Sequence, residues 1–112
     1  MMIGRGTTPQ QVFTTSIDLT TAEVLYITYK QAGKIRIEKT IDDCTITSTS
    51  VSTTLTQEET LQLIQDETVL LNGKSETPYV EIQIRARLAN GEVVRSNIMV
   101  SDVGRILKGG EI

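Results

Sequence analysis

The chain has no histidine, no tryptophan and one cysteine, Cys44, among its 112 residues. Histidine is the commonest general base and the commonest metal ligand, so its absence removes the usual centre of acid–base catalysis and of metal binding. One cysteine allows neither an internal disulfide nor a zinc site built from several thiolates. Because no histidine is present to activate it, Cys44 is interpreted as a small strand residue rather than a nucleophile.

Positive charge is in the minority, since 11 Lys and Arg stand against 14 Asp and Glu and give a net charge of −3. This balance predicts no nucleic-acid partner and no anionic membrane surface. No apolar run approaches the roughly 20 residues of a transmembrane helix. The first residues, Met1–Gly6, hold no apolar stretch like that of a signal peptide, so we expect a protein made in the cytoplasm that stays soluble.

The acidic and glycine-rich motifs also predict no chemistry. Asp42-Asp43, Glu58-Glu59 and Asp66-Glu67 are adjacent in sequence, so their side chains diverge, and they are interpreted as turn acids. Calcium at Asp42-Asp43 would need a regular spacing of oxygen ligands that the sequence lacks. Gly4–Gly6 and Gly109-Gly110 fit no phosphate loop. We therefore predict no enzyme and no catalytic, cofactor or metal site.

What the sequence does contain is a strict alternation of apolar and polar residues, which is typical of strands with one buried and one exposed face. Two hairpins are predicted, with strands over Leu25–Tyr29 and Lys34–Glu38 and over Val80–Leu88 and Glu92–Val100. A three-residue loop, Ala89–Gly91, keeps apolar residues together, and Gly91 suits the left-handed position that it needs. The pairs that this register predicts are Ala86–Val94, Ile84–Ser96, Ile82–Ile98 and Val80–Val100.

The loop Gln31–Gly33 is interpreted in the same way, so that Tyr29 opposes Ile35 and Ile27 opposes Ile37. The full strands of this hairpin are predicted over Glu23–Lys30 and Lys34–Thr40. Further strands are predicted over Gln10–Ile17, Cys44–Thr47 and Val51–Leu55.

Thr56 and Glu59 form a capping box that predicts one or two helical turns, whereas residues 65–78 fit either a short strand at 68–71 or a loop. The whole pattern predicts an all-β fold, an immunoglobulin-like antiparallel β-sandwich of about seven strands, with a barrel as the alternative. One domain is expected over 1–112, with flexible arms at 1–9 and 104–112.

The candidate interface residues lie on the last hairpin and in the tail. The predicted register places Arg85 across from Arg95, with Arg87 on the same face, and like charges opposite one another are unfavourable. Either the guanidinium groups splay into water, or a neighbouring strand or partner chain supplies a carboxylate between them. The apolar residues of the termini, Met1, Met2, Ile3, Ile106, Leu107 and Ile112, are expected to be exposed unless a partner covers them; disordered ends are the alternative.

Several blocks of the chain look familiar: Ile3–Pro9, Val24–Lys34, Ile37–Thr40, Leu55–Leu61, Val80–Arg85 and Val103–Ile112. Together they resemble a group of small uncharacterised proteins encoded in phages and prophages of Gram-positive bacteria. More loosely, the chain is similar to the N-terminal immunoglobulin-like domain of phage upper baseplate proteins. It departs from the group by an insertion-like stretch at about 67–77.

The resemblance implies a non-enzymatic structural protein of the virion, in the tail or baseplate, whose partners are other virion proteins or further copies of itself. It carries over no functional residue, and no cofactor is expected. The alternative is a module of the phage tail that binds carbohydrate or the host surface, for which Tyr26 and Tyr79 would be the platform residues.

Overall fold

The computed structural model describes residues 2–63, 69–71, 74–76, 79–104 and 110–112. A 3-10 turn, η1 (Ile41–Asp43), and one short helix, α1 (Gln57–Leu61), accompany the strands. The strands are β1 (Met2–Gly4), β2 (Gln10–Thr14), β3 (Ala22–Gln31), β4 (Lys34–Thr40), β5 (Cys44–Ile46), β6 (Ser50–Thr54), β7 (Val69–Leu71), β8 (Lys74–Glu76), β9 (Tyr79–Leu88), β10 (Val93–Arg95) and β11 (Met99–Gly104). None of the described helices is long and apolar enough to cross a membrane.

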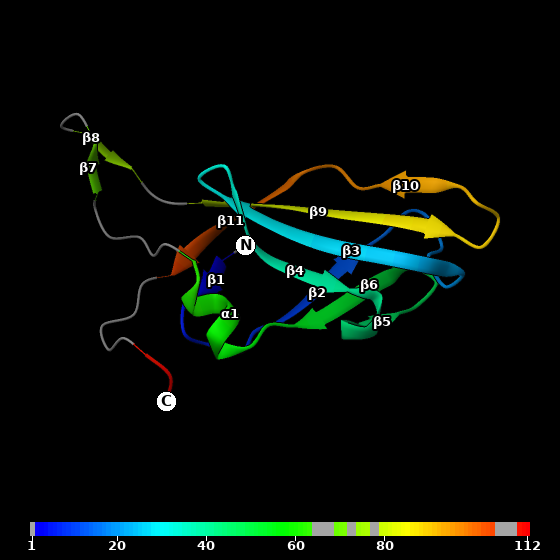
Figure 1. The fold of residues 1–112 in the computed structure, drawn as a ribbon, viewed down its shortest axis with the longest axis horizontal. Helices are drawn as coiled ribbons and strands as arrows, with labels where there is room; N and C mark the ends of the chain where they lie inside the picture. The colour runs from blue at the N-terminus through cyan, green and yellow to red at the C-terminus, as the bar shows by residue number, and fades with distance from the viewer. Residues whose placement is uncertain (1, 64–68, 72–73, 77–78, 105–109) are drawn as a thin grey trace.

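Two sheets face each other, and the strand order in each is that of an immunoglobulin-like sandwich (Figure 1). The large sheet has the order β1-β11-β9-β3-β4, with β10 also paired to β9, and the small sheet has the order β2-β6-β5. When β2 is taken as strand B, β3 to β6 become strands C, C′, D and E, and β9 and β11 become F and G. The orders are then G-F-C-C′ and B-E-D, as in variable-type domains. The predicted fold class is confirmed.

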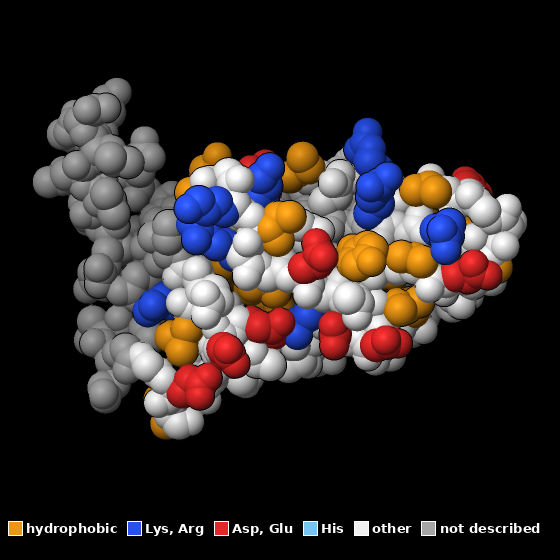
Figure 2. Space-filling view, in the orientation of Figure 1, with side chains coloured by type: hydrophobic (Ala, Val, Ile, Leu, Met, Phe, Trp, Pro, Cys, Tyr) orange, Lys and Arg blue, Asp and Glu red, His pale blue; other side chains and the backbone are white. Residues whose placement is uncertain are grey.

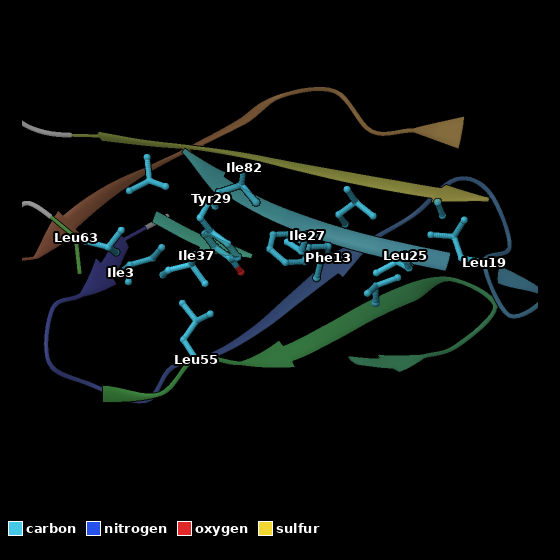
Figure 3. Close-up of a cluster of buried hydrophobic side chains, with 14 of the residues drawn as sticks. Ile3, Phe13, Leu19, Leu25, Ile27, Tyr29, Ile37, Leu55, Leu63 and Ile82 are labelled. Carbon is cyan, nitrogen blue, oxygen red and sulfur yellow. The ribbon is translucent and has the colours of Figure 1, made fainter. Parts of the chain in front are cut away.

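The core lies between the two sheets and is filled by the inward-facing residues of both (Figure 3). Leu25, Ile27 and Tyr29 of β3 point toward Phe13 of the small sheet, as the period of two requires. Leu19 closes one end, and Ile3 with Leu63 closes the other, near α1.

The last hairpin closes as the sequence predicts. Gly91 has a φ of 88°, and its N–H donates to the carbonyl of Leu88 at 2.9 Å. Ala86 pairs with Val94, and Arg85 pairs with Arg95. Glycine adopts this left-handed conformation without a steric penalty, so Gly91 fixes the loop length and with it the register of β10.

Beyond Ser96 the register shifts by one residue, and the predicted pairs Ile82–Ile98 and Val80–Val100 are wrong. Ile82 pairs with Met99 instead, and Val80 pairs with Ser101. The Ser96 hydroxyl accepts from the N–H of Ile84 at 2.9 Å, which ends the β10 ladder before β11 begins. Since side chains alternate along a strand, the shift turns Val100 outward and Ser101 inward.

The β3–β4 hairpin closes with a two-residue turn, Ala32-Gly33, and the predicted three-residue loop is wrong. Both residues have positive φ, 51° and 77°, as a type I′ turn requires, and Gln31 pairs with Lys34. The sequence pattern assigned a left-handed conformation to the glycine alone, because such a conformation costs an alanine about 1–2 kcal/mol.

A bulge between Tyr29 and Lys30 then moves the pairing of β3 and β4. Tyr29 lies opposite Ile37, and both are buried, so the predicted pairs Tyr29–Ile35 and Ile27–Ile37 are wrong. Ile35 lies on the outer face of the sheet and is 59% exposed.

The start of the chain belongs to the large sheet. Ile3 pairs in parallel with Val103 of β11, and it is completely buried. The expectation that Ile3 would be exposed is therefore wrong. Arg5 continues this attachment, because its guanidinium donates to the carbonyl of Leu63 at 2.9 Å beyond the end of α1. The flexibility of the two arms stays a prediction.

The predicted capping box is confirmed at α1. The Thr56 hydroxyl accepts from the N–H of Glu59 at 3.1 Å, and the Glu59 carboxylate accepts from the N–H of Thr56 at 2.9 Å. Of the stretch 65–78, for which a short strand and a loop were both considered, the described residues form the antiparallel strands β7 and β8, which stand apart from both sheets in Figure 1.

Candidate functional site

The outer face of the large sheet carries most of the exposed hydrophobic side chains among the described residues. They are Met2, Tyr26, Ile35, Tyr79, Val93 and Val100, each between 42% and 66% exposed. Figure 2 shows hydrophobic side chains interspersed with Lys and Arg over β3, β9 and β10. Folding has buried the opposite face of the same strands, so this outer face is the part of the sheet that remains available to a partner.

One end of this face carries three exposed hydrophobic residues, Met2, Tyr79 and Val100. Met2 pairs with Asp102, and Asp102 pairs with Tyr79, so these residues form one row across β1, β11 and β9, with the exposed Asp102 carboxylate between the two hydrophobic side chains. Val100 points to the same face two residues before Asp102. This arrangement depends on the parallel pairing of β1 and on the register shift in β11, which the sequence did not predict.

The other end of the face is basic and contains three of the five predicted interface residues. Arg95 lies directly opposite Arg85, and Tyr26 lies opposite Arg85 on the other side. Arg87 follows on the same face of β9. In the part of the chain that the structure describes, no salt bridge involves these arginines. The predicted juxtaposition is therefore confirmed, whereas its role in an interface stays a prediction.

The remaining two predicted interface residues, Ile106 and Leu107, lie outside the described residues. The chain end is described and contacts α1: the N–H of Ile112 donates to the side-chain oxygen of Gln57 at 2.8 Å. The Ile112 side chain itself is fully exposed, as the sequence suggested.

A groove of about 380 Å³ opens between the end of β2 and the connection from β10 to β11. Its apolar lining includes Phe13, Leu19, Ile84 and Met99, and the exposed Arg95 stands beside them. Arg95 is the one titratable residue among those that line it. Hydroxyl and amide groups of Thr14, Ser16, Ser96 and Asn97 contribute polar positions to the same lining.

Sequence reasoning missed a polar cluster inside the sandwich near α1. The Lys39 ammonium contacts the Glu59 carboxylate at 2.6 Å, and the Lys39 side chain is only 9% exposed. Nearby, the Tyr29 hydroxyl donates to the side-chain oxygen of Gln11 at 2.6 Å, and burial raises the pKa of Tyr29. The sequence did contain one signal for this cluster. Lys39 lies two residues after Ile37 in β4, so alternation places the Lys39 side chain on the same, buried face of the strand.

The remaining sequence candidates have structural roles in the described region. The Asp43 carboxylate accepts from the N–H of Thr40 at 3.0 Å, a bond that lowers the pKa of Asp43 and closes the η1 turn. Burial raises the pKa of the Cys44 thiol, which reduces the fraction present as thiolate. No group of three or more Cys, Asp or Glu among the described residues is arranged to hold a metal ion. Asp66-Glu67 lie outside the described residues.

No protein-family model and no curated protein matches the sequence. Among solved structures, the chain is similar to the immunoglobulin-like domain of mouse leukocyte-associated immunoglobulin-like receptor 1, there a strand-swapped dimer. The identity is 15%, the match covers 94% of this chain and 88% of that one, and the TM-score is 0.43. It is also similar to the V domain of amphioxus IgVJ-C2, at 9% identity, 94% and 100% coverage and a TM-score of 0.34. At such TM-scores, neither likeness adds to what the strand order shows.

Proposed function

We propose that this protein is a non-enzymatic structural component of a phage virion, in the tail or baseplate, and that it acts through protein–protein assembly. The observation that carries the assembly role is the outer face of the large sheet. Tyr26 lies exposed there beside Arg85 and Arg95, and Met2 and Tyr79 lie exposed at the other end of the same face. Methionine, tyrosine and arginine are enriched in protein interfaces, where they combine apolar area with directional hydrogen bonds. The phage setting is supported by the resemblance of the sequence blocks.

The direct test is quantitative mass spectrometry of virions purified from an induced lysogen that encodes this chain. We expect the protein in stoichiometric amount relative to other tail proteins. Its absence from intact virions, while it is abundant in the lysate, would remove the proposal.

The arginine end of the face supplies a sharper prediction. Arg85→Ala and Arg95→Ala are expected to lower virion incorporation severalfold while the isolated domain stays folded and melts at the same temperature or slightly higher. Removing one of two opposed like charges relieves repulsion in the free chain, worth a few tenths of a kcal/mol, but it also removes a donor to a partner carboxylate.

Lys34→Ala is the matched control, because Lys34 is also basic and exposed but lies at the tip of the β3–β4 hairpin. Incorporation is measured by quantitative mass spectrometry and folding by circular dichroism. If all three variants incorporate like the parent, the arginines are a tolerated charge clash and not a docking surface.

Carbohydrate or host-surface binding is the second candidate, because Tyr26 and Tyr79 are exposed aromatics on one face. Tyr26 lies opposite Arg85, six residues along β9 from Tyr79, so the two rings are roughly 20 Å apart at 3.3 Å per residue. They cannot hold one sugar between them. Micromolar binding on a glycan array that is lost in Tyr26→Ala or Tyr79→Ala would favour this candidate over assembly.

A further inference from the structure

Strand β2 is an edge of the small sheet, and it lacks the features that keep edges apart. It pairs with β6 on one side, and no other described strand pairs with it. No charged residue occurs between Arg5 and Asp18, a stretch that includes the whole of β2. Val12, at its centre, is 59% exposed.

The other described edges are protected. Strand β4 carries Lys34, Arg36 and Glu38, whereas β1, β5, β7, β8 and β10 are only three residues long. Short strands and charged side chains are the usual means by which edge strands avoid pairing with another chain. Pro9 directly precedes β2, but its carbonyl accepts from the N–H of Leu55, the residue that follows β6, so its ring nitrogen faces β6 and does not interrupt the free edge.

The free edge presents regularly spaced backbone groups. The N–H of Thr15 donates to the carbonyl of Thr49, which shows that odd-numbered residues of β2 form the hydrogen-bonded pairs with the small sheet. In an antiparallel ladder the groups of the intervening residues point the other way. The N–H and C=O groups of Gln10, Val12 and Thr14 are therefore directed away from β6.

We infer that a second copy of this chain pairs with the free edge of β2, antiparallel and about a two-fold axis at Val12. Each Val12 then exchanges two backbone hydrogen bonds with Val12 of the second copy, and Gln10 pairs with Thr14 of the second copy. The two small sheets join into one continuous sheet across the axis.

The absence of charge is what favours a second copy over a different partner. A two-fold axis brings each residue close to its own counterpart, so any charge near the centre of β2 would face a like charge. A neutral strand that is centred on Val12 satisfies this requirement, and a heterologous partner would impose no such restriction on the sequence.

The expected dimer is weak. A pairing of two five-residue edges is smaller than the roughly 1,200–2,000 Å² that a stable specific interface buries. The groove that Phe13 and Thr14 at the end of β2 help to line is a further surface that the second copy could contact. We therefore expect a dimer whose population rises with protein concentration.

The test is sedimentation velocity of the full chain over a range of concentrations, with Val12→Lys compared with Thr45→Lys. Thr45 is exposed on the same outer face of the small sheet, since Ser52 of β6 pairs with both Val12 and Thr45, but it lies on β5, at the opposite edge of that sheet. We expect the parent and Thr45→Lys to approach twice the monomer mass. Val12→Lys should need at least about tenfold higher concentration, because a lysine would face its own copy.

A charge-swap experiment separates loss of pairing from loss of folding. Val12→Lys and Val12→Glu should each remain monomeric, and their equimolar mixture should dimerise, because the introduced ammonium would then face the introduced carboxylate across the axis. A parent that is monomeric at all concentrations, or a mixture that stays monomeric while the parent dimerises, overturns the inference.

The inference deepens the proposed assembly role by naming a partner, but the two fail separately. A dimer formed by a protein that is absent from virions would remove the proposed function and leave the β2 pairing intact. Virion incorporation of a parent chain that is strictly monomeric in solution would do the reverse.

Discussion

Ile3→Ala is expected to lower the free energy of unfolding by about 2–5 kcal/mol, the range for truncating a fully buried isoleucine in a core that cannot collapse around the cavity. Ile3 is completely buried between the two sheets, and its strand pairs with β11. The loss would be a large fraction of the total stability of a chain of this size. Urea denaturation followed by circular dichroism measures it as a lower midpoint with an unchanged slope.

Met2→Ala is the control, since Met2 is the neighbouring residue of the same strand and is 66% exposed. Surface truncations of this kind usually change stability by no more than about 0.5 kcal/mol. Equal midpoints for the two variants would show that the start of the chain does not pack into the core in solution, and would favour the sequence-based expectation of a flexible arm.

The sequence could not show that Ile3 is buried, and the reason is physical. Alternation of apolar and polar residues identifies a strand when it continues over several residue pairs, but β1 is only three residues long and ends in glycine. Its partner is Val103, at the other end of the chain, and no local signal encodes a pairing of such large sequence separation. The hairpins, by contrast, are local, and three of their four strands were predicted to within three residues at each end. The strand predicted over Glu92–Val100 is instead interrupted after Arg95 and divided between β10 and β11.

Register was predictable at the start of the last hairpin, where one residue controls it. Gly91 supplies the only unstrained left-handed position of its loop, so the pairing of Arg85 with Arg95 followed from the sequence. The shift after Ser96 had no such marker, because a serine hydroxyl replaced a backbone acceptor in the ladder. The basic end of the candidate site was therefore predicted, and the apolar end around Tyr79 and Val100 was not.

The polar cluster shows a different limit of pattern reasoning. Lys39 has the inward position that alternation assigns to an apolar residue, and it is stabilised there by Glu59, which lies in the helical turn of α1. The alternation of apolar and polar residues allows a charged residue in an inward position only when an oppositely charged partner is available to it. Here that partner lies on a different element, so the alternation along β4 cannot reveal it. The capping box identified Glu59 as a helix residue, but it gave no sign that the same carboxylate also contacts Lys39.

Glu59→Gln is expected to destabilise the protein by about 2–3 kcal/mol, below the usual range for breaking a buried ion pair because Glu59 is itself partly exposed. Glutamine keeps the shape of the side chain and its capping role, so the change isolates the charge. Lys39 would be left buried with an uncompensated ammonium, since its side chain is only 9% exposed. The measurement is again the midpoint of urea denaturation.

Lys39→Met completes a double-mutant cycle with Glu59→Gln. Removing the ammonium should cost less than removing its partner, because the Glu59 side chain is 26% exposed and reaches water when Lys39 is absent. In the Lys39→Met, Glu59→Gln double variant, most of the loss caused by Glu59→Gln should be recovered, since no unpaired charge remains inside the sandwich. If Lys39→Met is instead the costlier change and the two effects simply add, the aliphatic stem of Lys39 contributes through packing, and the ion pair does not stabilise the fold.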